Sequence, residues 1–438
     1  MTRDRSAQNA RTIAADLEAR IRTGTLAPGA PLPSVRELAA AAAVSPVTAA
    51  AAVADLRRRG LIVTHERRRS YVSRRPPVAT STAPAVLPTG VRDVANGYPD
   101  VALLPDLGRA FARLEGAERT YDDEPTLPEL AELARAEFAE AGIDAEHICL
   151  ASGALDAVER ILGAHLGLGD RVAVEDPCYS ASLDLLRAMG LVPVAVPIDD
   201  RGLLPKPLAA ALAAGVDAVL LTPRAHNPTG AAFDDLRADE LARVLDRHRG
   251  VLVVEDDHQG PVAGVPGLSV VRRQARWARV RSVTKALGPD LRLAFVTGDE
   301  TTISRVEGRL TVGPGWVSGV LQRLVVELMS AKSVARTLAR ATRVYAERRQ
   351  ALLDALVERG VDATGRSGFN VWVPAPDEAQ AAAALLQRGW AVAPGAPFRL
   401  ESPPAVRVTT AALEPTEALV LADDIAAVLT PTRRRRAA

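Results

Sequence analysis

Lys285 is the residue in this sequence best suited to covalent chemistry. The chain has only three lysines, Lys206, Lys285 and Lys332, among 54 basic residues. Arginine cannot be deprotonated to act as a nucleophile, so a lysine kept in such an arginine-rich chain is a candidate for a reactive amine. Thr284 and Lys285 also follow a strand-like run, RVRSV (279–283), and ligands of open α/β sheets bind beyond such strand ends.

Three more chemically useful side chains follow strand-like runs elsewhere in the chain. Tyr179 follows VAVE (172–175), Asn227 follows AVLL (218–221) and Asp256 follows VLVVE (251–255). They offer an aromatic ring, an amide and a carboxylate beside the amine of Lys285. Because carboxyl ends of parallel strands meet at one edge of a sheet, we expect these side chains to lie together.

A phosphate site is predicted upstream, where Ser152 and Gly153 begin a helix with Ala154 and Leu155. The first N–H groups of a helix have no intrahelical partner and bind anions. These groups suit pyridoxal 5′-phosphate (PLP): an amine, a carboxylate, an amide, an aromatic ring and a helix start that binds phosphate. Lys285 would form the Schiff base, and Asp256 would hold the pyridinium N–H. No metal site is predicted.

The elements around these residues alternate between strands and helices from residue 93 onward. Most of the five runs at 172–175, 218–221, 251–255, 279–283 and 293–297 are apolar on both faces, as expected for strands of a buried parallel sheet. Long helical stretches follow from about 302 to 360, and then a small α/β segment. We expect an α/β domain over 93–438, with a large subdomain to about 310 and a small one over about 311–430.

The first 76 residues predict a different, mainly α domain. Helical patterns at 11–24, after Ser34 and at about 47–59 precede two short strand-like runs joined by ERRR, which is the order of a winged helix-turn-helix. Residues 1–77 contain 14 arginines and 6 acidic residues, so this head is strongly basic, whereas the rest of the chain is acidic. Such a head is expected to meet a polyanion. The proline-rich stretch before residue 93 is predicted to be a linker (77–92).

The composition excludes several other classes of protein. With 48% hydrophobic and 24% charged residues the chain is globular rather than disordered or collagen-like. Two cysteines, Cys149 and Cys178, favour a reducing cytoplasm over a disulfide framework. The N-terminus lacks the apolar core of a signal peptide, and the stretch Leu38–Ala54 is too short and polar to cross a bilayer, so no membrane partner is expected.

Five motifs, in their order and spacing, resemble the fold-type I aminotransferases: SGALDAV (152–158), EDPCY (175–179), HNPTG (226–230), VEDD (254–257) and SVTKALGPDLRLAF (282–295). With the head, LAPGAPLPSVRELA (26–39) and VSPVT (44–48), the whole chain resembles the MocR/GabR group of GntR-type regulators. HNPTG, EDDH and SGFNVWVP (367–374) are faintly similar to the PtsJ branch of these regulators, which is linked to vitamin B6 supply.

The resemblance implies a role for each site residue. Lys285 would hold PLP as the internal aldimine, Asp256 would pair with the ring nitrogen, Asn227 would bind the ring 3-oxygen and Tyr179 would stack on the ring. Phosphate would be bound by Ser282, Arg292 and the backbone at Gly153, Ala154 and Leu155. Arg407 would grip a substrate carboxylate, and Tyr121 would reach the phosphate of a partner subunit in a homodimer. Packing or ion-pair roles remain alternatives for several of these residues.

Two departures from the family pattern place transamination in question. His258 stands where the family usually has a tyrosine that binds the 3-oxygen, and its charge is expected to vary near neutral pH. Leu155 stands where a polar Gln is common. PLP binding is nevertheless expected.

The predicted DNA contacts lie in three parts of the head. Arg36 matches a family contact, and Ser45, Val47 and Thr48 begin the recognition helix. Arg67, Arg68 and Arg69 replace the usual Gly-x-Gly of the wing and are expected to contact phosphates or the minor groove. Pro46 and Ala50 stand where longer polar side chains are common, which limits base reading by this helix.

We therefore expect a cytoplasmic, homodimeric, PLP-dependent transcriptional regulator that binds a double-stranded operator. It would sense PLP or an amine such as an amino acid. An active aminotransferase with a vestigial or autoregulatory head is the main alternative, and a DNA-binding protein that does not use PLP is a third.

Overall fold

The computed structural model of the protein describes residues 2–22, 25–58, 60–64, 69–73, 87–114 and 120–429. Its contacts form two compact units. One contains the N-terminal residues Met1–Ala83 and the other contains most of the remaining chain.

The head has the element order that the sequence predicts. Helices α1 (Thr2–Arg22), α2 (Val35–Ala41) and α3 (Pro46–Arg58) precede an antiparallel ribbon of β1 (Ile62–Thr64) and β2 (Ser70–Val72). Ser34 caps α2 in a capping box, because its hydroxyl accepts from the Glu37 amide while the Glu37 carboxylate accepts from the Ser34 amide. The apolar stripes of the helices and the ribbon meet in one core around Leu17, Leu56 and Ile62.

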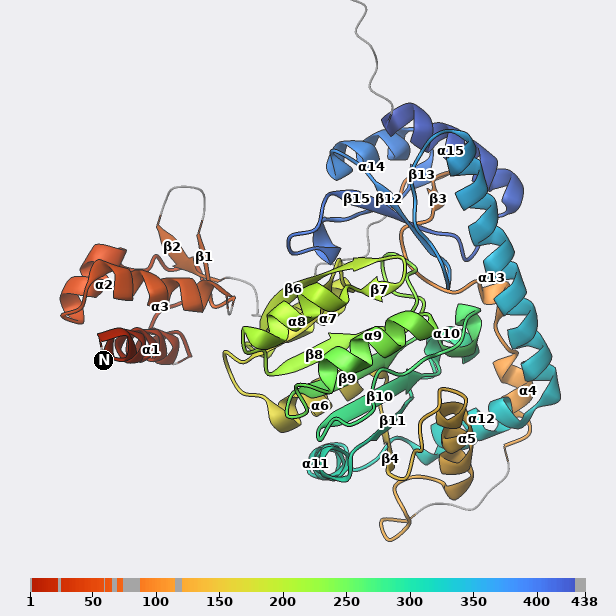
Figure 1. Cartoon of the computed structure of the whole chain (residues 1–438), viewed down its shortest axis with the longest axis horizontal. Helices are drawn as coiled ribbons and strands as arrows, with labels where there is room; N and C mark the ends of the chain where they lie inside the picture. The colour runs from red at the N-terminus through yellow and green to blue at the C-terminus, as the bar shows by residue number, and fades with distance from the viewer. Residues whose placement is uncertain are drawn as a thin grey trace, which may run out of the picture. The chain divides into compact units, whose positions relative to one another are not determined.

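The body is built on an eight-stranded sheet (Figure 1). Its strands run in the order β4 (Ile148–Ala151), β11 (Ala294–Gly298), β10 (Trp277–Ser282), β9 (Leu252–Asp257), β8 (Ala218–Leu221), β5 (Arg171–Asp176), β6 (Val192–Asp199) and β7 (Gly202–Leu203). The four central strands β10, β9, β8 and β5 pair in parallel. Their carboxyl ends therefore share one edge, which places the residues that follow them side by side.

One strand was wrongly expected to be parallel. Strand β11, the predicted run 293–297, pairs antiparallel with both of its neighbours, β10 and β4. The connection from β10 to β11 contains only the short helix α10 (Thr284–Leu287) and a turn. A parallel connection needs a crossover of a dozen or more residues, so the chain has to return antiparallel.

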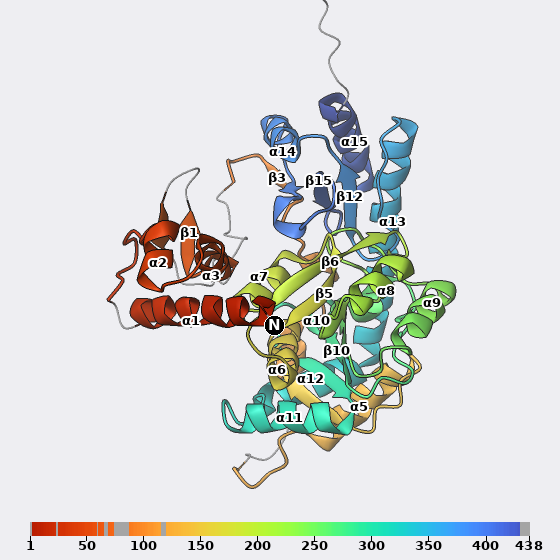
Figure 2. The ribbon, with the colours of Figure 1, turned by 60° about the vertical axis from the view of Figure 1, so that its left-hand side comes forward.

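Helices cover both faces of the large sheet (Figure 2). Helices α8 (Pro205–Ala213) and α9 (Asp235–Leu245) pack through Leu208 and Leu241 onto strand residues such as Val219 and Val253. Helix α6 (Ala154–His165) lies against β4, β9, β10 and β11. The remaining helices of this subdomain are α4 (Leu107–Phe111), α5 (Pro128–Ala139), α7 (Ser180–Ala188), α11 (Glu300–Thr311) and α12 (Gly319–Ser330).

The long helix α13 (Lys332–Glu358) leads into the small subdomain (Figure 1). There β12 (Asn370–Pro374), β15 (Ala405–Thr409) and β14 (Ala393–Pro394) form a sheet, covered by α14 (Glu378–Gln387) and α15 (Pro415–Leu429). Strand β13 (Trp390–Ala391) pairs in parallel with β3 (Arg92–Asp93). Arg92, predicted as the last linker residue, is thus part of the small subdomain.

No single helix in the described ranges is long and apolar enough to cross a membrane, although the bent pair Val35–Ala41 and Pro46–Arg57 reaches the threshold by length and composition only. Within the same ranges, no group of three or more His, Cys, Asp or Glu side chains is arranged to hold a metal ion.

Candidate functional site

Lys285 lies on α10, three residues beyond β10, in a largely buried position. Its Nζ donates a hydrogen bond to the Gly97 carbonyl at 2.7 Å and lies 5.9 Å from the ring centroids of Tyr98 and Phe369. Burial and the nearby cations Arg407 and Arg292 lower the pKa of Lys285 to about 8. A substantial fraction of this amine is therefore unprotonated at neutral to mildly alkaline pH, as a nucleophilic amine requires.

Asp256 is buried near the end of β9. Its Oδ1 has no hydrogen-bond partner in the described part of the chain. Burial and the acidic neighbours Asp257 and Glu175 raise its pKa to about 7. A cationic hydrogen-bond donor would stabilise the ionised form of such a buried carboxyl, and the protonated nitrogen of a pyridine ring is a donor of this kind.

The adjacent Asp257 has a different role although it has the same side chain. Arg224 holds it with two bonds of 3.0 and 2.8 Å, and Arg279 adds one of 3.2 Å. These arginines overcome the cost of burial and hold the pKa of Asp257 far below its usual range. Asp257 is thus an ionised structural group, and Asp256 is the carboxyl left for a ligand.

The phosphate site was predicted at the start of α6, where Arg292 approaches the first turn of the helix. Gly153 caps the helix at φ +105° with no side-chain cap, and Ala154 and Leu155 are the first helical residues. A Cβ built on Gly153 would come within 2.7 Å of Arg292 Nη2, so only glycine lets this guanidinium approach the helix start. The Ser152 amide is occupied, because it donates to Asp156 Oδ2 at 2.8 Å.

Ser282 is buried between β10 and α10. Its hydroxyl lies 2.9 Å from that of Thr284, and it accepts the Thr284 amide at 3.3 Å. The structure thus brings Thr284, which the sequence analysis did not select, into contact with a predicted phosphate ligand.

Arg407, on β15, reaches from the small subdomain to a residue beyond β8. Its Nη1 donates to Asn227 Oδ1 at 2.8 Å, its Nη2 donates to the Ala95 carbonyl, and its guanidinium carbon lies 4.7 Å from the Phe398 ring centroid. The buried Nε has no partner in the described ranges. Burial lowers the pKa of Arg407 to about 10. Two of the three guanidinium nitrogens of Arg407 are thus bonded within the chain, to Asn227 and Ala95.

Tyr179 and His258 follow β5 and β9. Tyr179 is 37% exposed, and burial raises the pKa of its phenol, with Arg407 and Asp256 as charged neighbours. The prediction for His258 was wrong: burial and the positive charge of Lys285 lower its pKa to about 3, so it is neutral throughout the physiological range instead of changing charge there.

Tyr121 lies apart from these contacts. Its side chain is 91% exposed and meets Trp316 edge to face, with ring centroids 5.5 Å apart. In the described chain, no hydrogen bond, ion pair or ring contact joins Tyr121 to Lys285 or to the other predicted site residues.

Sequence reasoning missed Gly97 and Phe369, which surround the Lys285 amine. The Asn-Gly pair at 96–97 is a turn signal and Gly97 has φ +69°, so the turn itself was predictable. Phe369 carries no local signal, because only the tertiary fold brings it to Lys285.

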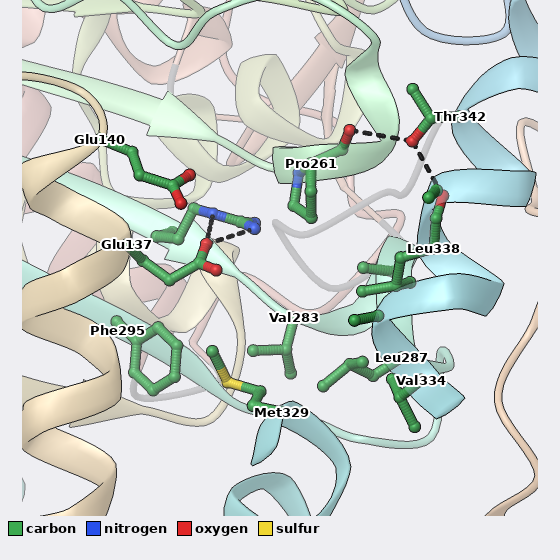
Figure 3. Close-up of a pocket in the computed structure, with 14 residues that line it drawn as sticks. Glu137, Glu140, Pro261, Val283, Leu287, Phe295, Met329, Val334, Leu338 and Thr342 are labelled. Carbon is green, nitrogen blue, oxygen red and sulfur yellow. Dashed lines mark hydrogen bonds and ion pairs between the residues drawn. The ribbon is translucent and has the colours of Figure 1, made fainter. Parts of the chain in front are cut away.

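A separate pocket of about 350 Å³ lies beside α10 (Figure 3). Val283, Ala286 and Leu287, which flank Lys285 in sequence, line it, but Lys285 does not. The charged groups on its wall include Arg281 and Glu137, which are already paired at 2.8 Å. This pocket contains none of the predicted site residues.

In the head, the exposed candidates for DNA contact are Arg36, Ser45, Val47 and Arg69. Val47 is 78% exposed at the start of α3. Thr48, in contrast, is buried, and its hydroxyl lies 2.9 Å from that of Ser45, so it stabilises the helix start and is not presented for a base contact. Arg67 and Arg68 lie outside the described residues.

Comparison with known families yields two matches. Residues 9–72 match the bacterial regulatory proteins of the gntR family, and residues 89–425 match aminotransferase class I and II. The vitamin B6 salvage pathway transcriptional repressor PtsJ of Salmonella typhimurium is 39% identical over 406 residues, which cover 92% of this chain and 94% of that protein. The HTH-type transcriptional regulator TauR of Rhodobacter capsulatus is 26% identical and covers 86% and 87% of the two chains.

Solved aminotransferases share the fold of the body. Kynurenine aminotransferase from Pyrococcus horikoshii superposes with a TM-score of 0.71 at 22% identity, over 78% of this chain and 91% of that one. The α-aminoadipate aminotransferase LysN from Thermus thermophilus gives a TM-score of 0.69 at 24% identity, over 78% and 92%. At these identities the likeness shows the fold, which confirms the predicted fold class.

Proposed function

Since the chain belongs to the MocR/GabR group of GntR-type regulators, we propose that it is a transcriptional regulator whose aminotransferase-like body binds PLP and controls DNA binding by the head. The observation that carries this proposal is the state of two largely buried groups, Lys285 and Asp256, at the carboxyl ends of the neighbouring parallel strands β10 and β9. The amine has a lowered pKa, and the carboxyl has a buried oxygen without a partner in the described ranges.

The residues of the site fit PLP, the cofactor that regulators of this type use. When bound, PLP supplies an aldehyde that reacts with an amine and a ring that withdraws electrons when its nitrogen is protonated. Asp256 would keep that nitrogen protonated, Asn227 and the neutral His258 would bind the 3-oxygen, and Tyr179 would stack on the ring. The amides at Gly153, Ala154 and Leu155, with Arg292 and Ser282, would hold the phosphate.

We propose PLP itself as the first effector. PtsJ, which is 39% identical to this chain, is named as a repressor of the vitamin B6 salvage pathway. A regulator of vitamin B6 supply can respond to that supply by binding PLP itself. A carboxylate-bearing amine is the second effector, because Arg407 is a buried cation whose Nε has no partner in the described chain. Either ligand alters DNA affinity only if it binds one arrangement of the protein more tightly than the other.

A homodimer in the cytoplasm completes the proposal. Tyr121 and Val312 are 91% and 88% exposed, and large apolar groups at such exposure favour burial against a second copy. Two heads would then span direct or inverted operator repeats.

The cytoplasm is proposed as the compartment because both cysteines, Cys149 and Cys178, are free and buried.

An active aminotransferase is the second candidate, and Arg407 is the observation that favours it. A panel of amino donors, with keto-acid formation measured, tests it directly. Appreciable turnover would replace the pure-regulator proposal.

The central experiment is fluorescence anisotropy with DNA from upstream of the protein's own gene, at fixed salt, with and without PLP. We expect specific binding at about 10⁻⁸ M or tighter that changes with PLP. Specific binding that ignores PLP would transfer the effector role to an amine. The absence of specific binding in both conditions would overturn the proposal that the protein is a transcriptional regulator.

A further inference from the structure

The chain enters the body through residues 92–98, which we call the entry segment. This segment begins at Arg92, the last residue of the predicted linker from the head. Arg92 and Asp93 form β3 on the small-subdomain strand β13, and the Val94 amide donates to the Ala391 carbonyl at 2.9 Å. Val94 is buried in the small-subdomain core. The entry segment is therefore the covalent route from the head to the ligand site.

Two backbone carbonyls of this segment accept hydrogen bonds from Lys285 and Arg407. Lys285 Nζ donates to the Gly97 carbonyl at 2.7 Å, and Arg407 Nη2 donates to the Ala95 carbonyl. A Cβ on Gly97 would meet the Arg407 guanidinium at 3.3 Å, so the backbone lies directly on that side chain. Hydrogen bonds from charged donors are the stronger ones, which makes these two bonds major anchors of the segment.

Thr409 provides a third anchor beside Arg407 on β15. Its hydroxyl accepts the Gly97 amide at 3.1 Å, and its own amide donates to the Val94 carbonyl at 2.8 Å. This anchor involves no side chain that would touch a ligand. The Thr409 hydroxyl, which also donates to Asn370 Oδ1 at 3.0 Å, can therefore be removed without changing Lys285 or Arg407, while the amide bond to Val94 remains.

We propose that the entry segment reports the occupancy of Lys285 and Arg407 to the linker. This inference rests on the proposed function and names the regulation of the same site.

When the Lys285 amine joins an aldehyde, a C=N bond forms at Nζ, and water leaves with the aldehyde oxygen and two amine hydrogens. The nitrogen then keeps at most one hydrogen, and the Gly97 carbonyl loses its ammonium donor. A carboxylate on Arg407 competes with the Ala95 carbonyl in the same way. Ligands and the entry segment thus compete for the same two donors, which is the differential binding that a switch needs.

The first test is amide hydrogen exchange of residues 94–98 in the cofactor-free full chain. Lys285→Ala should exchange at least about tenfold faster than wild type, since one charge-assisted bond is lost. Lys206→Ala, which removes an exposed lysine of the body, is the matched control and should exchange like wild type. Unchanged protection in Lys285→Ala would overturn the inference whatever the DNA affinity does.

The second test measures DNA affinity at fixed salt for cofactor-free Thr409→Val. We expect its affinity to move at least about threefold toward that of PLP-loaded wild type, with the visible absorbance of bound PLP retained on loading. Thr409→Ser keeps the hydroxyl and should restore the wild-type affinity.

The outcomes separate the two proposals. If PLP changes the affinity of wild type while Thr409→Val and Lys285→Ala leave it unchanged, the entry segment is not the route, but the regulator stands. If PLP leaves the wild-type affinity unchanged, the proposed function fails, and the inferred regulation fails with it.

Discussion

Asp256→Asn should change the stability of the cofactor-free body more favourably at pH 8 than at pH 5. The Asp256 carboxyl has a pKa of about 7 in the folded protein and 3.8 as its ordinary value. Between these values the folded state holds the proton that the unfolded chain releases, so stability falls as the pH rises from about 4 to 7. From this shift the buried carboxyl costs on the order of 4 kcal/mol at pH 8 and on the order of 2 kcal/mol at pH 5. The effect of Asn should thus be about 2 kcal/mol more favourable at pH 8.

Two features of the design isolate this effect. The Asn amide leaves polar atoms unsatisfied at a cost of about 1–3 kcal/mol, but that cost is the same at both pH values and cancels in the difference. Asp234→Asn is the control: its carboxylate is ionised at both pH values, because its hydrogen bonds to Arg201 lower its pKa to about 2. Its loss of stability should therefore be equal at pH 5 and pH 8.

Urea unfolding of the full chain measures these differences. Trp277, Trp316, Trp372 and Trp390 are the four tryptophans of the sequence and all lie in the body, so their fluorescence reports the body alone. Saturating PLP should stabilise wild type more than Asp256→Asn, because wild type gains the pairing of Asp256 with the ring nitrogen. An equal stability difference between Asp256→Asn and wild type at both pH values would refute the reasoning.

The remaining predictions concern loading, the phosphate cradle and the head. The rate at which PLP attaches to Lys285 should rise with pH and level off above about 8, since burial lowers the pKa of the attacking amine; a rate independent of pH, followed by absorbance, would contradict this. Gly153→Ala should weaken PLP binding by at least about tenfold, because its Cβ displaces the Arg292 guanidinium. Gly169→Ala, also at positive φ but with open space around its Cβ, should leave PLP affinity unchanged in the same titration. Arg36→Ala should lower DNA affinity and reduce the salt slope by about one, whereas Arg109→Ala in the body should change neither.

The main features of the fold follow from local signals in the sequence. Gly and Pro punctuation, helix caps such as Ser34 and the doubly apolar strand runs are each decided by a few neighbouring residues. Because parallel strands end at a common edge, the positions of Asn227, Asp256 and Lys285 after their strands were enough to predict one site. The antiparallel direction of β11 depended on the length of its connection, and the expectation for that strand was wrong.

The electrostatic state of the site was decided only by the tertiary structure. Asp256 and Asp257 are adjacent and chemically identical, yet arginines from other segments pair with only one of them. His258 is held neutral by burial and by Lys285. The bonds from Lys285 to Gly97 and from Arg407 to Ala95 join residues 188 and 312 positions apart. The local sequence determines which chemical groups the chain carries. Burial, and partners brought from distant segments, determine the charge of those groups and the residues to which they are hydrogen-bonded.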